Sequence, residues 1–256
     1  LINNGDGTFT KLNDAPFTTD VSNSFGSSVG DIDNDGDLDI IIARAFTTLK
    51  TANRLYINNN DGTFTKSNDA VVQDSGWTYG AAFGEYDNDG WLDLFQARCY
   101  NENENNVLFK NNGGSNKWIM LNLQGIVSNK SAIGAIVKLK AEISGQLVWQ
   151  MRKVAGQNGY CGQNLQIHFG LGDATQIDSL VIQWPSGIIQ SVQGLNLNEY
   201  NEIVEDTSTV SVNNESGQSP MGFHLYQNFP NPFNPSTTIS WQSPINSRQV
   251  LKVYDV

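Results

Sequence analysis

Short runs of apolar and β-branched residues, separated by turns rich in Gly, Asn and Asp, recur along the chain and predict an all-β protein. In the second half the runs are longer, and several alternate apolar with polar residues, as strands with one buried face do. They span 117–123, 133–140, 146–152, 164–172 and 177–183. A Pro-Ser-Gly turn follows the last run. The pattern predicts a compact β-sandwich or barrel over residues 117–205.

An internal repeat organises the first half of the chain. Residues 1–11 resemble residues 56–66, and both copies carry Asp-Gly-Thr-Phe, in which the Asp-Gly dipeptide is typical of a hairpin turn. Runs of small residues at 27–30 and 80–84 predict strands that pack closely against a neighbour. An all-β repeat of this length is typical of a propeller blade, so residues 1–116 are predicted to form a partial β-propeller of about two blades.

A densely acidic loop follows each run of small residues. Residues 31–39 read Asp-Ile-Asp-Asn-Asp-Gly-Asp-Leu-Asp, and residues 85–93 read Glu-Tyr-Asp-Asn-Asp-Gly-Trp-Leu-Asp. Carboxylates this close repel one another unless a cation lies among them, and Ca²⁺ takes about six to eight oxygen ligands. We predict backbone carbonyl ligation by Asp37 and Trp91 and side-chain ligation by the others. The predicted calcium ligands are Asp31, Asp33, Asp35, Asp37, Asp39, Glu85, Asp87, Asp89, Trp91 and Asp93.

Two alternatives compete with this calcium hypothesis. An EF-hand needs a bidentate Glu at position 12 and flanking helices, whereas position 12 is Ile42 or Gln96 and strand-like residues follow both loops. A solvated turn without metal is the second alternative. The repetition of the motif in the same context favours calcium over a bare turn.

Composition narrows the classes of partner. Lys and Arg total 15 against 26 Asp and Glu, and the net charge of −11 disfavours nucleic acid and anionic membranes. No apolar run is long enough to span a bilayer. The chain begins inside a repeat and without a signal peptide, so we expect a fragment. Cys99 and Cys161 lack metal-ligand spacing and fall in different predicted domains, and we expect two unpaired, buried thiols.

No catalytic motif stands out, and we expect no enzymatic activity. The chain contains neither Gly-x-Ser-x-Gly nor His-Glu-x-x-His. His168 lies between Ile167 and Phe169 in a predicted strand, so it should face solvent or a polar partner. Three aromatic residues are predicted to fill the blade core, with an exposed sugar-binding face as the alternative. They are Trp77, Tyr79 and Trp91.

The repeats resemble the FG-GAP or VCBS repeats of integrin-like β-propellers. The matching residues are Phe25-Gly26, Phe83-Gly84, the two acidic loops and the Asn-Asn-Gly-Asp-Gly-Thr-Phe elements. The resemblance implies calcium bound in the nine-residue loops and a ring of about seven blades, the missing ones lying upstream of Leu1. Glu85 departs from the pattern, which has Asp at this position.

Residues 117–205 resemble the ASPIC/UnbV domain. The resemblance rests on Gly134-Ala135, the region from Gly159-Tyr160 to Gln163-Asn164, residues 168–172 (His-Phe-Gly-Leu-Gly) and residues 184–187 (Trp-Pro-Ser-Gly). That domain follows a VCBS propeller in its family, as it does here. It implies an architecture and no established catalysis.

A polar, aperiodic linker is predicted at residues 206–222. After it, residues 226–239 place three prolines close together, and strands are predicted at 237–241 and 250–256. Residues 223–256 resemble the truncated start of the type A C-terminal sorting domain of the bacterial type IX secretion system, an Ig-like β-sandwich. The resemblance implies the type IX secretion machinery as a partner and an extracellular or outer-membrane cell-surface location.

These patterns together favour a calcium-binding, secreted or cell-surface binding or adhesion protein. Its calcium-stabilised propeller would present a face to an extracellular protein or glycan. One alternative is a non-catalytic or accessory part of an extracellular polysaccharide-processing enzyme. Another is a purely structural spacer.

Overall fold

The computed structural model describes residues 2–13, 15–20, 23–46, 51–98, 104–158, 161–162, 164–209, 224–225 and 241–242. It divides the chain into a unit of residues 1–209 and a unit of residues 210–256. With 5% helix and 48% strand, it confirms the all-β prediction. In the described part of the chain, no helix is long and apolar enough to cross a membrane.

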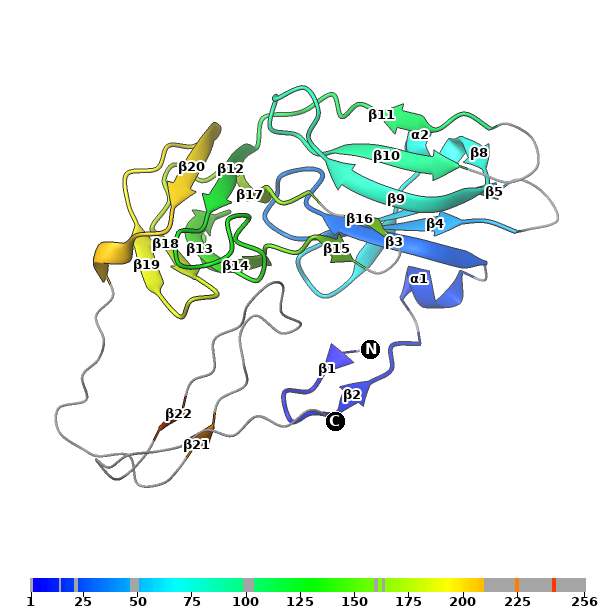
Figure 1. The fold of residues 1–256 in the computed structure, drawn as a ribbon. Helices are drawn as coiled ribbons and strands as arrows, with labels where there is room; N and C mark the ends of the chain where they lie inside the picture. The colour runs from blue at the N-terminus through cyan, green and yellow to red at the C-terminus, as the bar shows by residue number, and fades with distance from the viewer. Residues whose placement is uncertain are drawn as a thin grey trace. The chain divides into compact units, whose positions relative to one another are not determined.

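The first half of the larger unit is built from short antiparallel sheets (Figure 1). A four-stranded sheet has the order β3-β4-β6-β7, and a three-stranded sheet has the order β11-β10-β9. The strands of these sheets are β3 (Ser24–Gly30), β4 (Asp39–Arg44), β6 (Arg54–Asn58), β7 (Phe64–Lys66), β9 (Thr78–Gly84), β10 (Asp93–Arg98) and β11 (Val107–Phe109). Smaller elements are β1 (Ile2–Asn3), β2 (Phe9–Thr10), β5 (Thr51–Ala52), β8 (Ser75–Gly76), α1 (Pro16–Thr19) and α2 (Ala70–Gln73).

The local predictions for this half are confirmed. Both Asp-Gly dipeptides lie in hairpin turns, between β1 and β2 and between β6 and β7. Strands β3 and β9 pack against one another. A side-chain carbon added at Gly30 would lie 2.9 Å from the ring of Phe83, so the small residue is required by this close approach. The hydrophobic core of this half consists of Ile41, Ala43, Leu55, Val71, Val72, Ala81, Phe83 and Leu94.

The second half consists of two sheets that enclose a separate core. The sheet orders are β17-β12-β20 and β14-β13-β18-β19, and β12 pairs with β20 in parallel. The strands are β12 (Lys117–Gln124), β13 (Ile136–Ile143), β14 (Gln146–Lys153), β17 (Ile167–Gly172), β18 (Ser179–Gln183), β19 (Ile189–Val192) and β20 (Glu199–Val204). The short strands β15 (Gln157–Asn158) and β16 (Cys161–Gly162) form a ladder of their own, and a 3₁₀ turn η1 occupies Thr207–Thr209.

Alternation along β13 shows how this core is made. Val137, Leu139 and Ala141 are fully buried, whereas Lys138 between them is exposed. Burying a side chain the size of Leu stabilises a fold by about 1.5–3 kcal/mol, so these alternating positions fix the register of the strand. The described residues form no closed barrel, and the two sheets that enclose this core fit the sandwich form of the prediction. The pattern missed β20, whose residues are mostly polar.

Little of the C-terminal unit is described. β21 (His224–Leu225) pairs antiparallel with β22 (Trp241–Gln242). The predicted strand at 250–256, most of the predicted strand at 237–241 and linker residues 210–222 lie outside the described residues. So does Cys99, and the prediction for the two thiols stays open.

Candidate metal centre

The two acidic loops adopt matching backbone conformations. Loop 1 (residues 31–39) joins β3 to β4, and loop 2 (residues 85–93) joins β9 to β10. Positive φ occurs at the fourth and sixth positions of both, with Asn34 at 58° and Gly36 at 106°, and Asn88 at 63° and Gly90 at 83°. Asn and Gly tolerate this left-handed conformation best, which explains why they occupy these positions.

The structure gathers some of the predicted ligands. Asp31, Asp33 and Asp39 each offer one oxygen, and these oxygens lie within 4.8 Å of one another. In loop 2 the corresponding group consists of Glu85, Asp87 and Asp89. The other predicted ligands, Asp35, Asp37, Trp91 and Asp93, belong to neither group.

The Asp at the ninth position has a structural role that the sequence analysis missed. Asp39 accepts hydrogen bonds from the backbone N–H groups of Ile32 at 3.0 Å and Asn58 at 2.9 Å. Asp93 makes the same pair of bonds, to Tyr86 at 3.1 Å and Asn111 at 2.8 Å. Each carboxylate therefore ties its loop to the residue at the end of the next strand. The sequence signal for this role is the Asn-Asn dipeptide that recurs at the end of β6 and just after β11.

Loop 1 is buried, and the charge of Arg152 acts on Asp31 and Asp37 without forming an ion pair with either of them. Asp31 and Asp39 are almost inaccessible to solvent. Oδ1 of Asp33 and both carboxylate oxygens of Asp37 are buried without a hydrogen-bond partner among the described residues. Burial, reinforced by the neighbouring carboxylates, raises the pKa of Asp37 to about 6. Burial raises the pKa of Asp39 to about 7 and that of Asp31 well above its ordinary value.

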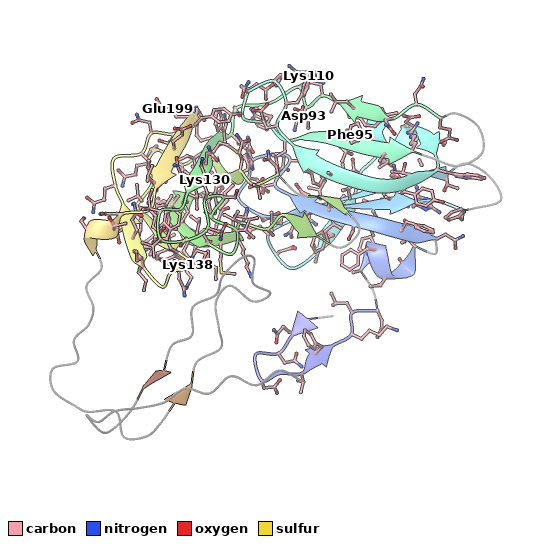
Figure 2. The ribbon with its side chains drawn as sticks, viewed as in Figure 1. Asp93, Phe95, Lys110, Lys130, Lys138 and Glu199 are labelled. Atoms are coloured by element: carbon pink, nitrogen blue, oxygen red, sulfur yellow. The ribbon has the colours of Figure 1, made fainter. Side chains whose placement is uncertain are left out.

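Loop 2 has a cation of its own. Lys110, which Figure 2 labels, donates a hydrogen bond to Oδ2 of Asp87, and its Nζ lies 3.6 Å from Oδ2 of Asp89. The hydrogen bond lowers the pKa of Asp87 and raises that of Lys110. Burial still raises the pKa of Glu85. Sequence analysis missed Lys110, which precedes Asn111 just as Ile57 precedes Asn58 in the repeat before it.

Both loops contact the second half of the unit. The N–H of Gly170 donates to Asp31 Oδ2 at 3.1 Å, and the N–H of Gly172 donates to the carbonyl of Asn34 at 2.7 Å. A side-chain carbon at Gly170 would lie 2.3 Å from Asp31 Oδ2, and one at Gly90 would lie 1.8 Å from the ring of Trp118. Glycine is therefore required on both sides of this junction.

Of the two environments predicted for His168, solvent or a polar partner, the structure shows the polar partner. His168 is 8% exposed, and its Nε2 lies 3.3 Å from the carbonyl oxygen of Gly90, which is the polar partner. Phe169 and Leu171 enter the sandwich core as the alternation predicts, but the loops cover the opposite face of β17. Burial lowers the pKa of His168 to about 3, so the ring is neutral at neutral pH.

The aromatic residues of the first half are divided between core and surface. Trp91 is buried, as predicted. Trp77 and Tyr79 are half-buried and pack around Phe46, with ring centroids 6.3 and 5.0 Å from it. Phe25 adds a further contact, 5.1 Å from Tyr79. The prediction that Trp77 and Tyr79 fill the blade core is therefore wrong, because they pack instead in an aromatic cluster with the exposed Phe25 and Phe46.

Comparison with known proteins defines the classes of repeat and domain. Residues 1–42 and 45–96 match the family described as FG-GAP-like repeat, and residues 125–210 match the family described as ASPIC and UnbV. FG-GAP repeats are typical of extracellular proteins. The resemblance of residues 223–256 to a sorting domain stays a prediction.

Cartilage acidic protein 1 from several vertebrates is similar over most of this chain. The Xenopus tropicalis protein is 30% identical over 212 residues, which are 77% of this chain and 31% of that protein. The Homo sapiens protein is 28% identical over 211 residues, with the same coverage. The Mus musculus protein is 28% identical over 183 residues, 68% of this chain and 28% of that protein. This chain therefore spans about three tenths of the length of these relatives.

Proposed function

We propose that the protein is a calcium-binding, extracellular binding or adhesion protein. The observation that carries this proposal is loop 1, where buried carboxylate oxygens of Asp33 and Asp37 have no partner among the described residues. Unpaired buried charge is costly, and a divalent cation among these oxygens would remove the cost. Asp31, Asp33 and Asp39 would hold the ion, with Asp35 and Asp37 completing its oxygen ligands.

Calcium suits these ligands better than a transition metal. Every candidate side-chain ligand is a carboxylate, and hard oxygen ligands are what Ca²⁺ prefers. Extracellular calcium modules bind with a dissociation constant of about 10⁻⁴–10⁻³ M, which millimolar calcium outside cells saturates. Loop 2 has the same donor chemistry, but Lys110 competes with an ion there. We infer that loop 1 is the tighter site.

The strand order of two sheets supports a propeller whose blades are stabilised by calcium. In sheet β3-β4-β6-β7 each strand pairs antiparallel with the next, which is the order found in a propeller blade. Sheet β9-β10-β11 repeats the same order. We propose that these are two blades, and that the propeller presents its loops to an extracellular protein or glycan.

The C-terminal segment supports export as part of the proposal. The proline-rich residues 226–239 carry the resemblance to a type IX sorting domain, and their binding partner would be that secretion machinery. A bacterial cell-surface or extracellular location follows from this proposal.

Thermal unfolding of the full chain tests the calcium proposal. At a calcium concentration about 100 times Kd, one site adds about 2.7 kcal/mol to the free energy of unfolding. For a domain of this size the gain corresponds to a Tm increase of about 5–10 °C. Asp33→Asn should remove most of that increase. Glu142→Gln, an exposed residue on β13, removes the same charge and should keep it. A folded wild-type protein whose Tm ignores calcium would refute the proposal.

A further inference from the structure

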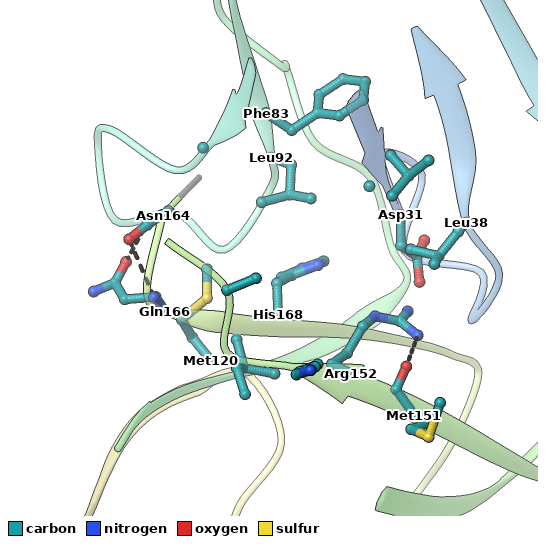
Figure 3. A pocket seen from close by; sticks show the side chains of 16 residues that line it. Asp31, Leu38, Phe83, Leu92, Met120, Met151, Arg152, Asn164, Gln166 and His168 are labelled. Atoms are coloured by element: carbon teal, nitrogen blue, oxygen red, sulfur yellow. Dashed lines mark hydrogen bonds between the residues drawn. The ribbon is translucent and has the colours of Figure 1, made fainter. Parts of the chain in front are cut away.

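A cavity of about 430 Å³ lies where strands β3 and β9 face strands β14 and β17 (Figure 3). Its volume falls in the range of small-molecule sites, about 300–1,000 Å³. Phe83, Leu92 and Met120 contribute apolar wall, whereas Arg152 and His168 contribute polar groups. An apolar cavity with a few convergent polar groups is the usual form of a ligand site. Of the proposed calcium ligands, Asp31 lines this cavity and the others do not.

Arg152 brings a charge to the cavity, and the carboxylates of Asp31 and Asp37 act on this charge without pairing with it. Its guanidinium donates to Oε1 of Gln150 at 3.0 Å and to the carbonyl of Met151 at 3.2 Å. It also lies over the ring of Phe169, 5.0 Å from the centroid. Among the described residues it forms no ion pair. Two of its five N–H groups are thus used, and the other three have no hydrogen-bond partner among the described residues, so they could bind an anion in the planar, two-pronged geometry that carboxylates fit.

His168 supplies an acceptor. The carbonyl of Gly90 can only accept a hydrogen bond, so Nε2 of His168 carries the proton that is donated to it. In the neutral ring Nδ1 is then an acceptor, and it is buried without a partner among the described residues. A buried acceptor left unpaired is costly, and an O–H or N–H group of a ligand would satisfy it.

We propose that this cavity binds an apolar carboxylate that carries a hydrogen-bond donor beside its carboxyl group. The carboxylate pairs with Arg152, the donor bonds to His168, and the apolar body packs against Phe83 and Leu92. A free 2-hydroxy acid and the C-terminal residue of an apolar peptide share this chemistry. Asp31 also lines the cavity, but both of its carboxylate oxygens accept backbone N–H bonds, which hold its charge toward loop 1.

Titration calorimetry or ligand-observed NMR on the full chain tests the proposal with 3-phenyllactate as the probe. Two analogues test the hydroxyl group and the negative charge of the probe separately. The first, 3-phenylpropionate, lacks the hydroxyl group, and the second, the methyl ester of phenyllactate, lacks the charge. We expect saturable binding of phenyllactate, at least about fivefold weaker binding of phenylpropionate, and at least about tenfold weaker binding of the ester. N-acetyl-Ala-Ala-Phe tests the peptide source, and binding of either acid supports the shared chemistry.

Three variants localise the binding. Arg152→Met should weaken phenyllactate binding by at least about tenfold, and Lys138→Met, exposed on β13 outside the cavity, should leave it unchanged. Gly84→Leu should abolish binding while the chain stays folded. Gly84 lines the cavity, and a side-chain carbon there meets nothing within 4 Å. Absence of saturable binding of both acids to the wild type, or binding that survives both Arg152→Met and Gly84→Leu, would overturn the proposal.

Discussion

Loops 1 and 2 share a motif and a backbone conformation, yet their surroundings differ. Loop 1 lies against β17, with its first Asp buried and accepting an N–H bond from Gly170. Loop 2 is more open, and Lys110 lies on its carboxylates. Asn58 bonds to Asp39 of loop 1 just as Asn111 bonds to Asp93 of loop 2. The residue before Asn111 is Lys110, whereas the residue before Asn58 is Ile57, which carries no charge. The comparison shows that one residue at the end of a strand changes the charge around an acidic loop, because Lys110 pairs with loop 2 and Ile57 brings no charge to loop 1.

The largest expected effect concerns the junction that covers both loops. Gly90→Ala places a side-chain carbon 1.8 Å from the ring of Trp118. Gly62→Ala is a matched control, because φ is 83° at Gly90 and 85° at Gly62, and the carbon at Gly62 meets nothing within 4 Å. Overpacking costs about 1–3 kcal/mol, so Gly90→Ala should lose that much more free energy of unfolding than Gly62→Ala. Urea denaturation measures both, and equal losses would mean that loop 2 does not pack on Trp118.

The second-largest expected effect is on the calcium affinity of loop 2. Removing the Lys110 charge should tighten calcium binding there by about tenfold, because a unit charge about 4 Å from a divalent ion costs about 1–2 kcal/mol even in water. The change is best measured in an Asp33→Asn background, which isolates loop 2. There Lys110→Met is compared with Lys130→Met, whose lysine is exposed and takes part in neither loop. Equal calcium affinities would show that Lys110 does not compete with the ion.

A smaller effect is a pH dependence of the calcium-free protein. The pKa values of Asp37 and Asp39 are about 6 and about 7 in the folded state, above an ordinary Asp value of about 4. Folding therefore takes up protons between about pH 4 and pH 7, and stability falls as the pH rises through this window. Saturating calcium should remove the fall, since it stabilises the ionised carboxylates. Melting curves of the metal-free protein at about pH 5, 6 and 7 measure this loss of stability. A Tm that stays constant over these pH values would contradict the prediction.

Glu205 is a buried carboxylate with the opposite environment. It accepts N–H bonds from Ile126, Val127 and Ser128 at 2.7, 2.8 and 2.7 Å, and hydroxyl bonds from Ser128 and Ser186. These bonds outweigh its burial and lower its pKa to about 2. Its contribution to stability is therefore present above an unfolded pKa of about 4.3 and is lost as the pH falls toward 2. In loop 1, Oδ1 of Asp33 and both carboxylate oxygens of Asp37 lack such donors among the described residues, which is the situation a cation would correct.

The sequence analysis predicted the structural features that are set by residues close together in the chain. The hairpin turns, the strands on either side of the loops and the alternation along β13 are local patterns, and all three are present. What it missed depends on contacts between distant residues. β20 is polar and pairs in parallel with β12, His168 is covered by loops far away in the chain, and Lys110 reaches back to Asp87. No local pattern around these residues records such partners.

Calorimetric titration of calcium into the full chain and two matched variants tests the difference between the loops most directly. Asp33→Asn and Asp87→Asn remove the same charge from the third position of loop 1 and of loop 2. We expect the tightest calcium site to persist in Asp87→Asn and to disappear in Asp33→Asn. Loss of that site in Asp87→Asn with retention in Asp33→Asn, or no binding by the wild type, would contradict the assignment of loop 1 as the principal calcium site.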